Sequence, residues 1–209
     1  MYHNFENLSE DKKQRILEAC IIEFAEKGYE KASTNTIIKQ AEISKGILFH
    51  YFGNKKSMFL YIFEYCLQFF ISEYKKYPLQ ISEDIFDRII EIGLIKLKIT
   101  HANPKISKLV LYAYMNTPED IRSEIHKKYT KLSNEILPTL FKDIDDSKFR
   151  DDVDSKKALE IVMLFLEALQ VKYTKAYQGR EQELLADMDK IMEEYKQYIE
   201  ILKYGMYPA

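Results

Sequence analysis

Residues 33–56 carry the pattern that most restricts how this chain can fold. Three short apolar segments lie in this stretch, and each follows a side chain suited to cap a helix: Ser33 or Thr34, then Ser44, then Asn54. The spacing predicts helices over about 34–41 and 44–52, joined by a tight turn, and a further helix that begins near residue 54. Two short helices joined in this way form a helix-turn-helix.

The rest of the chain also predicts helices. Its 209 residues contain six glycines and five prolines, which favours long helices over many short strands. Apolar residues recur at helical spacing over residues 9–28, where Gly28 is suited to end a helix. Further helix starts follow near residues 82, 103, 117, 155 and 181. We therefore expect an all-α fold of about nine helices, with a three-helix unit over residues 1–53 and a helical remainder over 54–209.

Charge is unevenly distributed along the chain. The formal net charge is −2, yet residues 31–57 hold five lysines and one acid, a local net charge of +4. Local charge decides contact with phosphates more than total charge does. The helix-turn-helix segment is therefore suited to a polyanionic partner.

The predicted helix over 44–52 has an unusual surface. On a helical wheel Leu48 and Phe52 share one face and should pack on the preceding helices. Gly46, Ile47 and His50 lie on the opposite face. A surface helix that exposes such side chains together indicates a binding partner.

Three lysines, Lys45, Lys55 and Lys56, fall in the first turns of predicted helices. A cation there opposes the helix dipole by about 0.3–1 kcal/mol. Elsewhere the chain places acids at helix starts, as at Glu10, Asp11, Glu119 and Asp120. Phosphate oxygens beside the lysines would reverse the sign of this interaction, which favours DNA binding over lysines that are merely solvated.

The run KGILFHYFGNK and the residues before it resemble the DNA-binding motif of tetracycline-repressor-type (TetR/AcrR) transcriptional regulators. The first helix, the chain length and the two long C-terminal helices are also similar to that family. The resemblance implies a ligand-responsive repressor, with no enzymatic activity, that binds a near-palindromic double-stranded DNA operator as a homodimer. Residues 1–53 would bind DNA, and residues 54–209 would bind an effector and dimerise.

The resemblance also implies which residues meet DNA. Thr34 and Lys55 would contact phosphates, and Ser44, Lys45 and Gly46 would bring the start of the recognition helix to the DNA backbone and base edges. Three side chains would face the major groove or its walls: Ile47, His50 and Tyr51. Phe49 holds a position where the family usually has a phosphate-contacting tyrosine, so that hydroxyl is lost here.

Other positions depart from the family pattern. Glu42 replaces the usual glycine of the turn, so we expect backbone strain or another turn shape. Ile38 replaces a small residue, and Gly53 replaces a polar one. Ile47 can touch a thymine methyl group but cannot form a hydrogen bond.

The C-terminal half predicts a dimer interface and an effector pocket. Apolar stripes run along 155–178 (Leu159, Met163, Leu166, Leu169 or Gln170, Tyr173) and 181–203 (Leu184, Met188, Ile191, Tyr195, Ile199, Leu202). Paired with a second copy they would form a four-helix interface, and the alternative is that both stripes are intramolecular core. Aromatic and methionine content suggests a small hydrophobic effector, with four candidate lining residues: Tyr112, Met115, Phe165 and Tyr173.

Other function classes find little support. The first residues lack an apolar signal core, no run is long enough to span a bilayer, and Cys20 and Cys66 fit reduced core residues, so we expect a cytoplasmic protein. The histidines and cysteines show no zinc spacing, and Asp143 to Asp154 only loosely echo a calcium loop, so we expect no metal and no cofactor. The remaining alternative is a helical small-molecule-binding or carrier protein without a DNA role.

Overall fold

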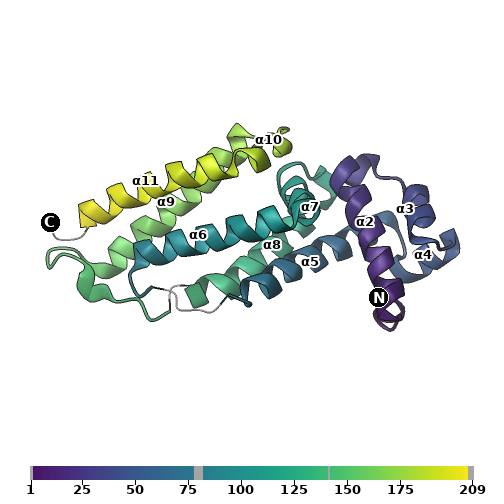
Figure 1. Ribbon diagram of the computed structural model, residues 1–209, viewed down its shortest axis with the longest axis horizontal. Coiled ribbons are helices and arrows are strands. Elements are labelled where there is room, and N and C mark those ends of the chain that lie inside the picture. Colours follow the sequence, from purple (N-terminus) through teal and green to yellow (C-terminus); the bar gives the residue numbers. More distant parts are fainter. Residues whose placement is uncertain (1, 78–81, 141, 207–209) are drawn as a thin grey trace. The chain divides into compact units, whose positions relative to one another are not determined.

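The computed structural model describes residues 2–77, 82–140 and 142–206 (Figure 1). In these ranges the chain forms only helices, which confirms the expected all-α class. The α-helices are α1 (His3–Glu6), α2 (Glu10–Lys31), α3 (Thr34–Ala41), α4 (Lys45–Phe52), α5 (Lys55–Tyr74), α6 (Ile85–Ala102), α7 (Pro104–Met115), α8 (Glu119–Leu140), α9 (Ser155–Ala176), α10 (Glu181–Ala186) and α11 (Met188–Met206). A 3-10 helix, η1, spans Asp146–Lys148.

Nine of the helices have seven or more residues, as the periodicity predicts. Two details differ from the expectation. The helix expected over 181–203 is divided at Asp187 into α10 and α11, and α1 is an additional helix. No helix within the described ranges is both long and apolar enough to cross a membrane.

Packing divides the chain into two compact units. Unit 1 comprises Met1–Ser72 and Asn103–Leu132, and unit 2 comprises Glu73–Ala102 and Ser133–Ala209. The predicted division near residue 53 is therefore not a packing boundary. Most of α5, all of α7 and the first part of α8 pack with the helix-turn-helix, because the apolar faces of α5 are buried in the same core as those of α2.

The core of unit 1 is built around α5. Its side chains Met58, Phe59, Ile62, Phe63 and Cys66 are buried, as expected for a helix that is apolar almost all round. These side chains pack in one cluster with apolar residues of α2, α3, α4, α7 and α8. The helix-turn-helix is therefore anchored to the rest of unit 1 through α5.

Gly28 allows α7 to approach α2 closely. Its backbone has φ 68° and ψ 177°, so the regular geometry of α2 breaks there, as the sequence predicts. A Cβ atom at this position would overlap the ring of Tyr112 on α7. Glycine is thus required twice, by its positive φ and by the space that Tyr112 fills.

Unit 2 packs α6 against α9 and α11. Its core contains Ile85, Phe86, Ile89, Val162 and Ile199. Glycine allows close packing here as well, because a Cβ on Gly93 of α6 would lie 2.9 Å from the Cε of Met192 on α11.

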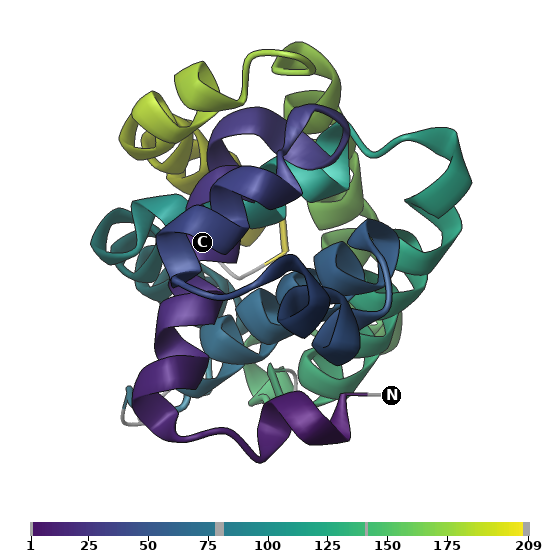
Figure 2. The same cartoon turned by 90° about the vertical axis from the view of Figure 1, so that its right-hand side faces the viewer.

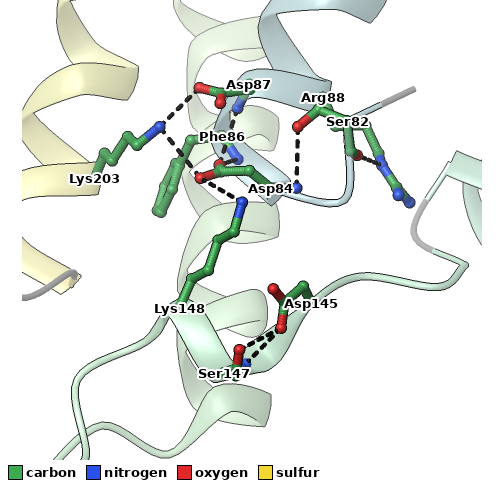
Figure 3. Close-up of polar contacts among 9 residues, drawn as sticks. All are labelled: Ser82, Asp84, Phe86, Asp87, Arg88, Asp145, Ser147, Lys148 and Lys203. Carbon is green, nitrogen blue, oxygen red and sulfur yellow. Dashed lines mark hydrogen bonds and ion pairs between the residues drawn. The ribbon is translucent and has the colours of Figure 1, made fainter. Parts of the chain in front are cut away.

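A charged cluster at the start of α6 joins several segments of unit 2 (Figure 3). The carboxylate of Asp84 accepts from the backbone N–H groups of Phe86 and Asp87 at 2.9 and 3.2 Å. Figure 3 shows Lys203 of α11 and Lys148 of η1 directed at the same carboxylate, at 3.2 and 3.8 Å. Burial alone would raise the pKa of Asp84, but the backbone N–H groups and the Lys203 ammonium hold it below its ordinary value.

Part of each stripe predicted for the dimer interface is covered within unit 2. Leu169 and Ile199 are buried, and four further members pack against the core: Leu159, Leu166, Tyr195 and Leu202. For these residues the intramolecular alternative holds. Helical periodicity marked them as one face of each helix, but α6 covers that face within the same unit.

The Gly28→Ala variant should lose about 3 kcal/mol or more of unfolding free energy, because backbone strain and overlap with Tyr112 each cost about 1–3 kcal/mol. Urea unfolding followed by circular dichroism measures this loss. Gly53→Ala is the matched control: Gly53 also has positive φ, at 76°, but nothing lies within 4 Å of a Cβ placed there. Equal losses in the two variants would show that contact with Tyr112 contributes nothing.

Candidate nucleic-acid interface

The helix-turn-helix forms from α3 and α4, each capped as predicted. The hydroxyl of Ser33 accepts from the backbone N–H of Thr36 at 3.4 Å, and that of Ser44 from Ile47 at 3.3 Å. Asn54 caps α5 in the same way, accepting from Ser57 at 2.8 Å. Buried Glu23 of α2 also accepts from the backbone N–H of Ser33 at 2.7 Å, which ties the start of α3 to α2.

Glu42 at the turn adopts the left-handed conformation, with φ 53° and ψ 44°. Its backbone N–H and that of Ile43 close the end of α3 onto the carbonyls of Lys39 and Ile38. A helix usually ends this way on glycine, because a Cβ is strained in the left-handed region. The turn therefore keeps the shape that glycine would give it, and Glu42 accommodates the strain that the sequence predicts.

The buried and exposed faces of α4 follow the helical wheel for most residues. Leu48 and Phe52 are fully buried, as predicted. Ile47 is 36% exposed, and Lys45 and Gly46 are exposed beside it. A Cβ on Gly46 would have only the Ser44 hydroxyl within reach, at 4.0 Å. No described part of the chain requires glycine at this position, which fits a close approach by another molecule.

Tyr51 is a correction to the predicted surface. Its side chain is only 8% exposed, and its ring lies edge-on to Phe5 of α1 with the ring centroids 5.8 Å apart. The ring of Tyr51 therefore packs inside unit 1, contrary to the expectation that this side chain faces the major groove or its walls. Phe49 is half-buried, so it contributes an apolar edge to the surface.

Lys55 and Lys56 are not both free for phosphates. The ammonium of Lys55 donates to the Glu30 carbonyl at 2.9 Å, near the end of α2. Lys56 donates to the carbonyl of Asp120 at 3.0 Å and pairs with Glu124 at 2.7 Å, both on α8. Lys56 lies in the first turn of α5, as predicted, but its charge is balanced within unit 1.

Helix α1 lies beside α4, as Figures 1 and 2 both show. The side-chain amide of Asn4 is 2.9 Å from Nε2 of His50, which is otherwise exposed on α4. Helix α1 was not among the helices predicted from the sequence. The feature that could have indicated it is the aromatic pair Tyr2 and Phe5, which are three residues apart and lie just before the predicted helix start at Ser9.

The four predicted effector residues are divided between the two units. Tyr112 and Met115 belong to unit 1, where Tyr112 lies against Gly28 and Met115 is buried. Phe165 and Tyr173 belong to unit 2. Phe165 packs against that unit's core, and the hydroxyl of Tyr173 donates to Glu194 at 2.8 Å.

Unit 1 contains an open groove of about 430 Å³ between α2, α5 and the start of α7. Apolar side chains form most of its wall: Leu17, Ile21, Ile22, Tyr65, Phe69, Pro104 and Ile106. None of the four predicted effector residues lines this groove.

Two family models match the chain. The model described as bacterial regulatory proteins, tetR family, matches residues 16–62. The model described as tetracyclin repressor-like, C-terminal domain, matches residues 82–207. The first range includes α3, α4 and parts of α2 and α5, and the second includes α6 to α11, so the match extends well beyond the helix-turn-helix.

Curated relatives and solved structures agree with these models. The chain is 26% identical over 157 residues to the biofilm operon icaADBC HTH-type negative transcriptional regulator IcaR of Staphylococcus epidermidis, covering 74% of this chain and 80% of that protein. A TetR family regulator from Chloroflexus aurantiacus superposes with a TM-score of 0.59 at 21% identity, covering 99% and 98% of the two chains. FadR of Bacillus subtilis in complex with stearoyl-CoA gives 0.56 at 17% identity, covering 86% and 95%. These structural likenesses show a shared fold.

The Glu42→Gly variant should be more stable than the wild type by about 0.5 kcal/mol. Relief of left-handed strain contributes about 1–2 kcal/mol, and the greater freedom of glycine in the unfolded chain removes about 0.5–1 kcal/mol. The exposed ion pair with Arg15, at 3.3 Å, adds little. Urea unfolding measures the difference. Lys39→Gly, in the regular part of α3, is the control and should lose about 1 kcal/mol; the same loss in both variants would contradict the strain at Glu42.

Proposed function

The chain belongs to the TetR family of bacterial regulatory proteins, and from this premise we propose that it is a repressor released from its operator by a small hydrophobic effector. The observation that carries the DNA-binding part is the exposed face of α4. It presents Lys45, Gly46 and Ile47 together on a capped helix, with open space where a glycine side chain would lie. The proposal that the protein represses transcription is supported by its similarity to IcaR, a negative regulator.

In this proposal α4 enters the major groove of the operator. Ser44, Lys45 and Gly46 bring its first turn to the DNA backbone, and Ile47 contacts a thymine methyl group. Thr34, at the start of α3, contacts a phosphate. His50 presents its imidazole from the exposed side of α4, and Phe49 lends an apolar edge but no hydroxyl.

In this proposal Lys55 still contacts a phosphate, but part of its hydrogen-bonding capacity is already used within the chain. An ammonium has three N–H donors, and the bond to the Glu30 carbonyl uses one of them. Burial lowers the pKa of Lys55 and the nearby acids Glu23 and Glu30 oppose this effect. Lys45 carries more of the electrostatic attraction, because its side chain is exposed.

A second copy of the chain is proposed to bind unit 2 through an apolar surface of α9 and α11. Ile161, Leu164 and Val171 lie on one face of α9 and are 49%, 59% and 50% exposed. On α11, Ile201 and Tyr204 are 69% and 80% exposed. These side chains replace the predicted stripes as the interface. Operator recognition supports the dimer, because two half-sites about 34 Å apart require two recognition helices.

Effector release is proposed to act through α5. This helix begins directly after α4 and forms the middle of the unit 1 core, so a ligand that displaced it would displace the recognition helix as well. Binding of effector and of operator would then oppose each other by the same factor. A screen for compounds that raise the melting temperature of the protein identifies the effector. If a saturating concentration of that ligand left the affinity for the operator unchanged, this mechanism would be wrong.

The alternative of a carrier protein without a DNA role loses its main support. The sequence features that favour this alternative are the departures from the family pattern at Glu42 and Phe49. Glu42 preserves the usual turn geometry, and Phe49 leaves the exposed face of α4 in place.

The experiment that tests the proposal is selection of genomic DNA fragments by the purified protein, followed by fluorescence anisotropy on the selected site. Tight binding that survives excess nonspecific competitor is the expected result. A protein that selects no fragment, and whose weak binding disappears with added salt, would not be a regulator.

Lys45→Ala should weaken binding to all DNA sequences, because its contact is with phosphate. The slope of log K against log salt should become shallower by about 0.9 per subunit. Anisotropy titrations over a range of salt concentrations measure the slope. Lys156→Ala, an exposed lysine of α9 in unit 2, removes the same charge and should leave the slope unchanged; an unaltered slope in Lys45→Ala would remove this residue from the interface.

Leu164→Glu should weaken the dimer by about 2–4 kcal/mol, because a charge would be buried in the proposed interface. Analytical ultracentrifugation over a concentration range measures the dissociation constant. Leu94→Glu is the control, since Leu94 is 41% exposed on α6 and lies outside the proposed surface. A Leu164→Glu protein that dimerises like the wild type would place the interface elsewhere.

A further inference from the structure

Helix α1 is firmly held against the helix-turn-helix. The ring of Phe5 is fully buried and meets three rings of α4 and α5, those of Tyr51, Phe52 and Tyr61, at centroid distances of 5.8, 4.8 and 5.4 Å. The hydroxyl of Tyr2 donates to the Ser57 carbonyl at 3.1 Å. The matched DNA-binding family model begins at residue 16, so this helix is an addition to the part that the model describes.

This anchoring brings Asn4 to the exposed side of α4. Its Nδ2 lies 2.9 Å from Nε2 of His50, and both side chains are exposed. An amide nitrogen can only donate a hydrogen bond, so Nε2 of the neutral ring accepts. The ring proton then resides on Nδ1, which leaves Nδ1–H as the donor available to another molecule.

We propose that Asn4 is a positioning residue for DNA recognition, which holds His50 in one orientation and one tautomer so that Nδ1–H meets an acceptor of the operator. This inference rests on the proposed function. The acceptor is a phosphate oxygen or a base-edge acceptor of the major groove, both of which take a hydrogen bond from a neutral imidazole.

The physical benefit is preorganisation. An exposed histidine that rotates freely must be immobilised when DNA binds, and it must also adopt the tautomer that donates. The bond from Asn4 meets both requirements before binding. Phe5 and Tyr2 fix the backbone of α1, so Asn4 is held by packing that does not involve His50 itself.

The chain contains a matched control for this pair. Asn7 and His3 are also joined by an amide and an imidazole, with Nδ2 3.0 Å from Nε2, and both are exposed. Both members of that pair lie in the α1 segment, and their hydrogen bond does not involve α4. Asn7→Ala therefore removes the same chemistry without affecting the recognition helix.

The first test needs no DNA. Nitrogen chemical shifts of the His50 ring, measured by NMR at a pH where the ring is neutral, report which nitrogen carries the proton. We expect Nδ1–H in the wild type, a shift toward Nε2–H in Asn4→Ala, and Nε2–H in Asn4→Asp, whose carboxylate can only accept. A His50 tautomer that is the same in the wild type and in Asn4→Ala overturns the proposal.

The second test is a double-mutant cycle on the selected operator. Asn4→Ala should weaken binding about 3–10-fold, as expected for a loss of preorganisation, while Asn7→Ala should leave affinity unchanged. The effect of Asn4→Ala should vanish in the His50→Ala background. An effect that persists there, or one equal to that of Asn7→Ala, overturns the positioning role. Failure to select any operator would count against the proposed function instead, because the tautomer measurement stands without DNA.

Discussion

The close approach of α7 to α2 at Gly28 is the contact on which the arrangement of unit 1 depends. The break in α2 at this glycine turns the chain toward Ser33, where α3 begins, and the absent side chain leaves room for the ring of Tyr112. One residue thus ends the regular part of α2 before the helix-turn-helix and packs α2 against α7. This explains why the compact unit includes Asn103–Leu132 as well as the N-terminal helices, and why no packing boundary falls at residue 53.

The packing of unit 1 also determines which lysines of the positively charged segment have partners within the fold. Lys56 is neutralised by Glu124 of α8, a residue 68 positions later in the chain, and Lys55 donates to the end of α2, where the helix dipole favours a cation. Lys45 stays exposed at the start of α4. A lysine in the first turn of a helix therefore has different consequences, according to whether a carboxylate or carbonyl from another helix reaches it.

The candidate interface shows how far reasoning from sequence extends. The helical wheel correctly placed Leu48 and Phe52 in the core and Ile47 outside it. The family resemblance was misleading for Tyr51, because Phe5 of α1 covers its ring. For the stripes along α9 and α11 the sequence left two alternatives open, and six of their residues are covered within unit 2, while Ile161 and Leu164 are exposed.

The order of amino acids was enough to predict most of the helices, the caps at Ser33, Ser44 and Asn54, the helix-turn-helix and the family. These follow from interactions between residues within four positions of each other or from short motifs. For the turn at Glu42 the resemblance left two outcomes open, backbone strain or another turn shape, and the structure has the left-handed, strained conformation. Packing in three dimensions settled the partners of Lys55 and Lys56, the burial of Tyr51, the role of α1 and the exposed surface of unit 2. Each of these depends on which distant segment covers a given face, and helical periodicity carries no information about that segment.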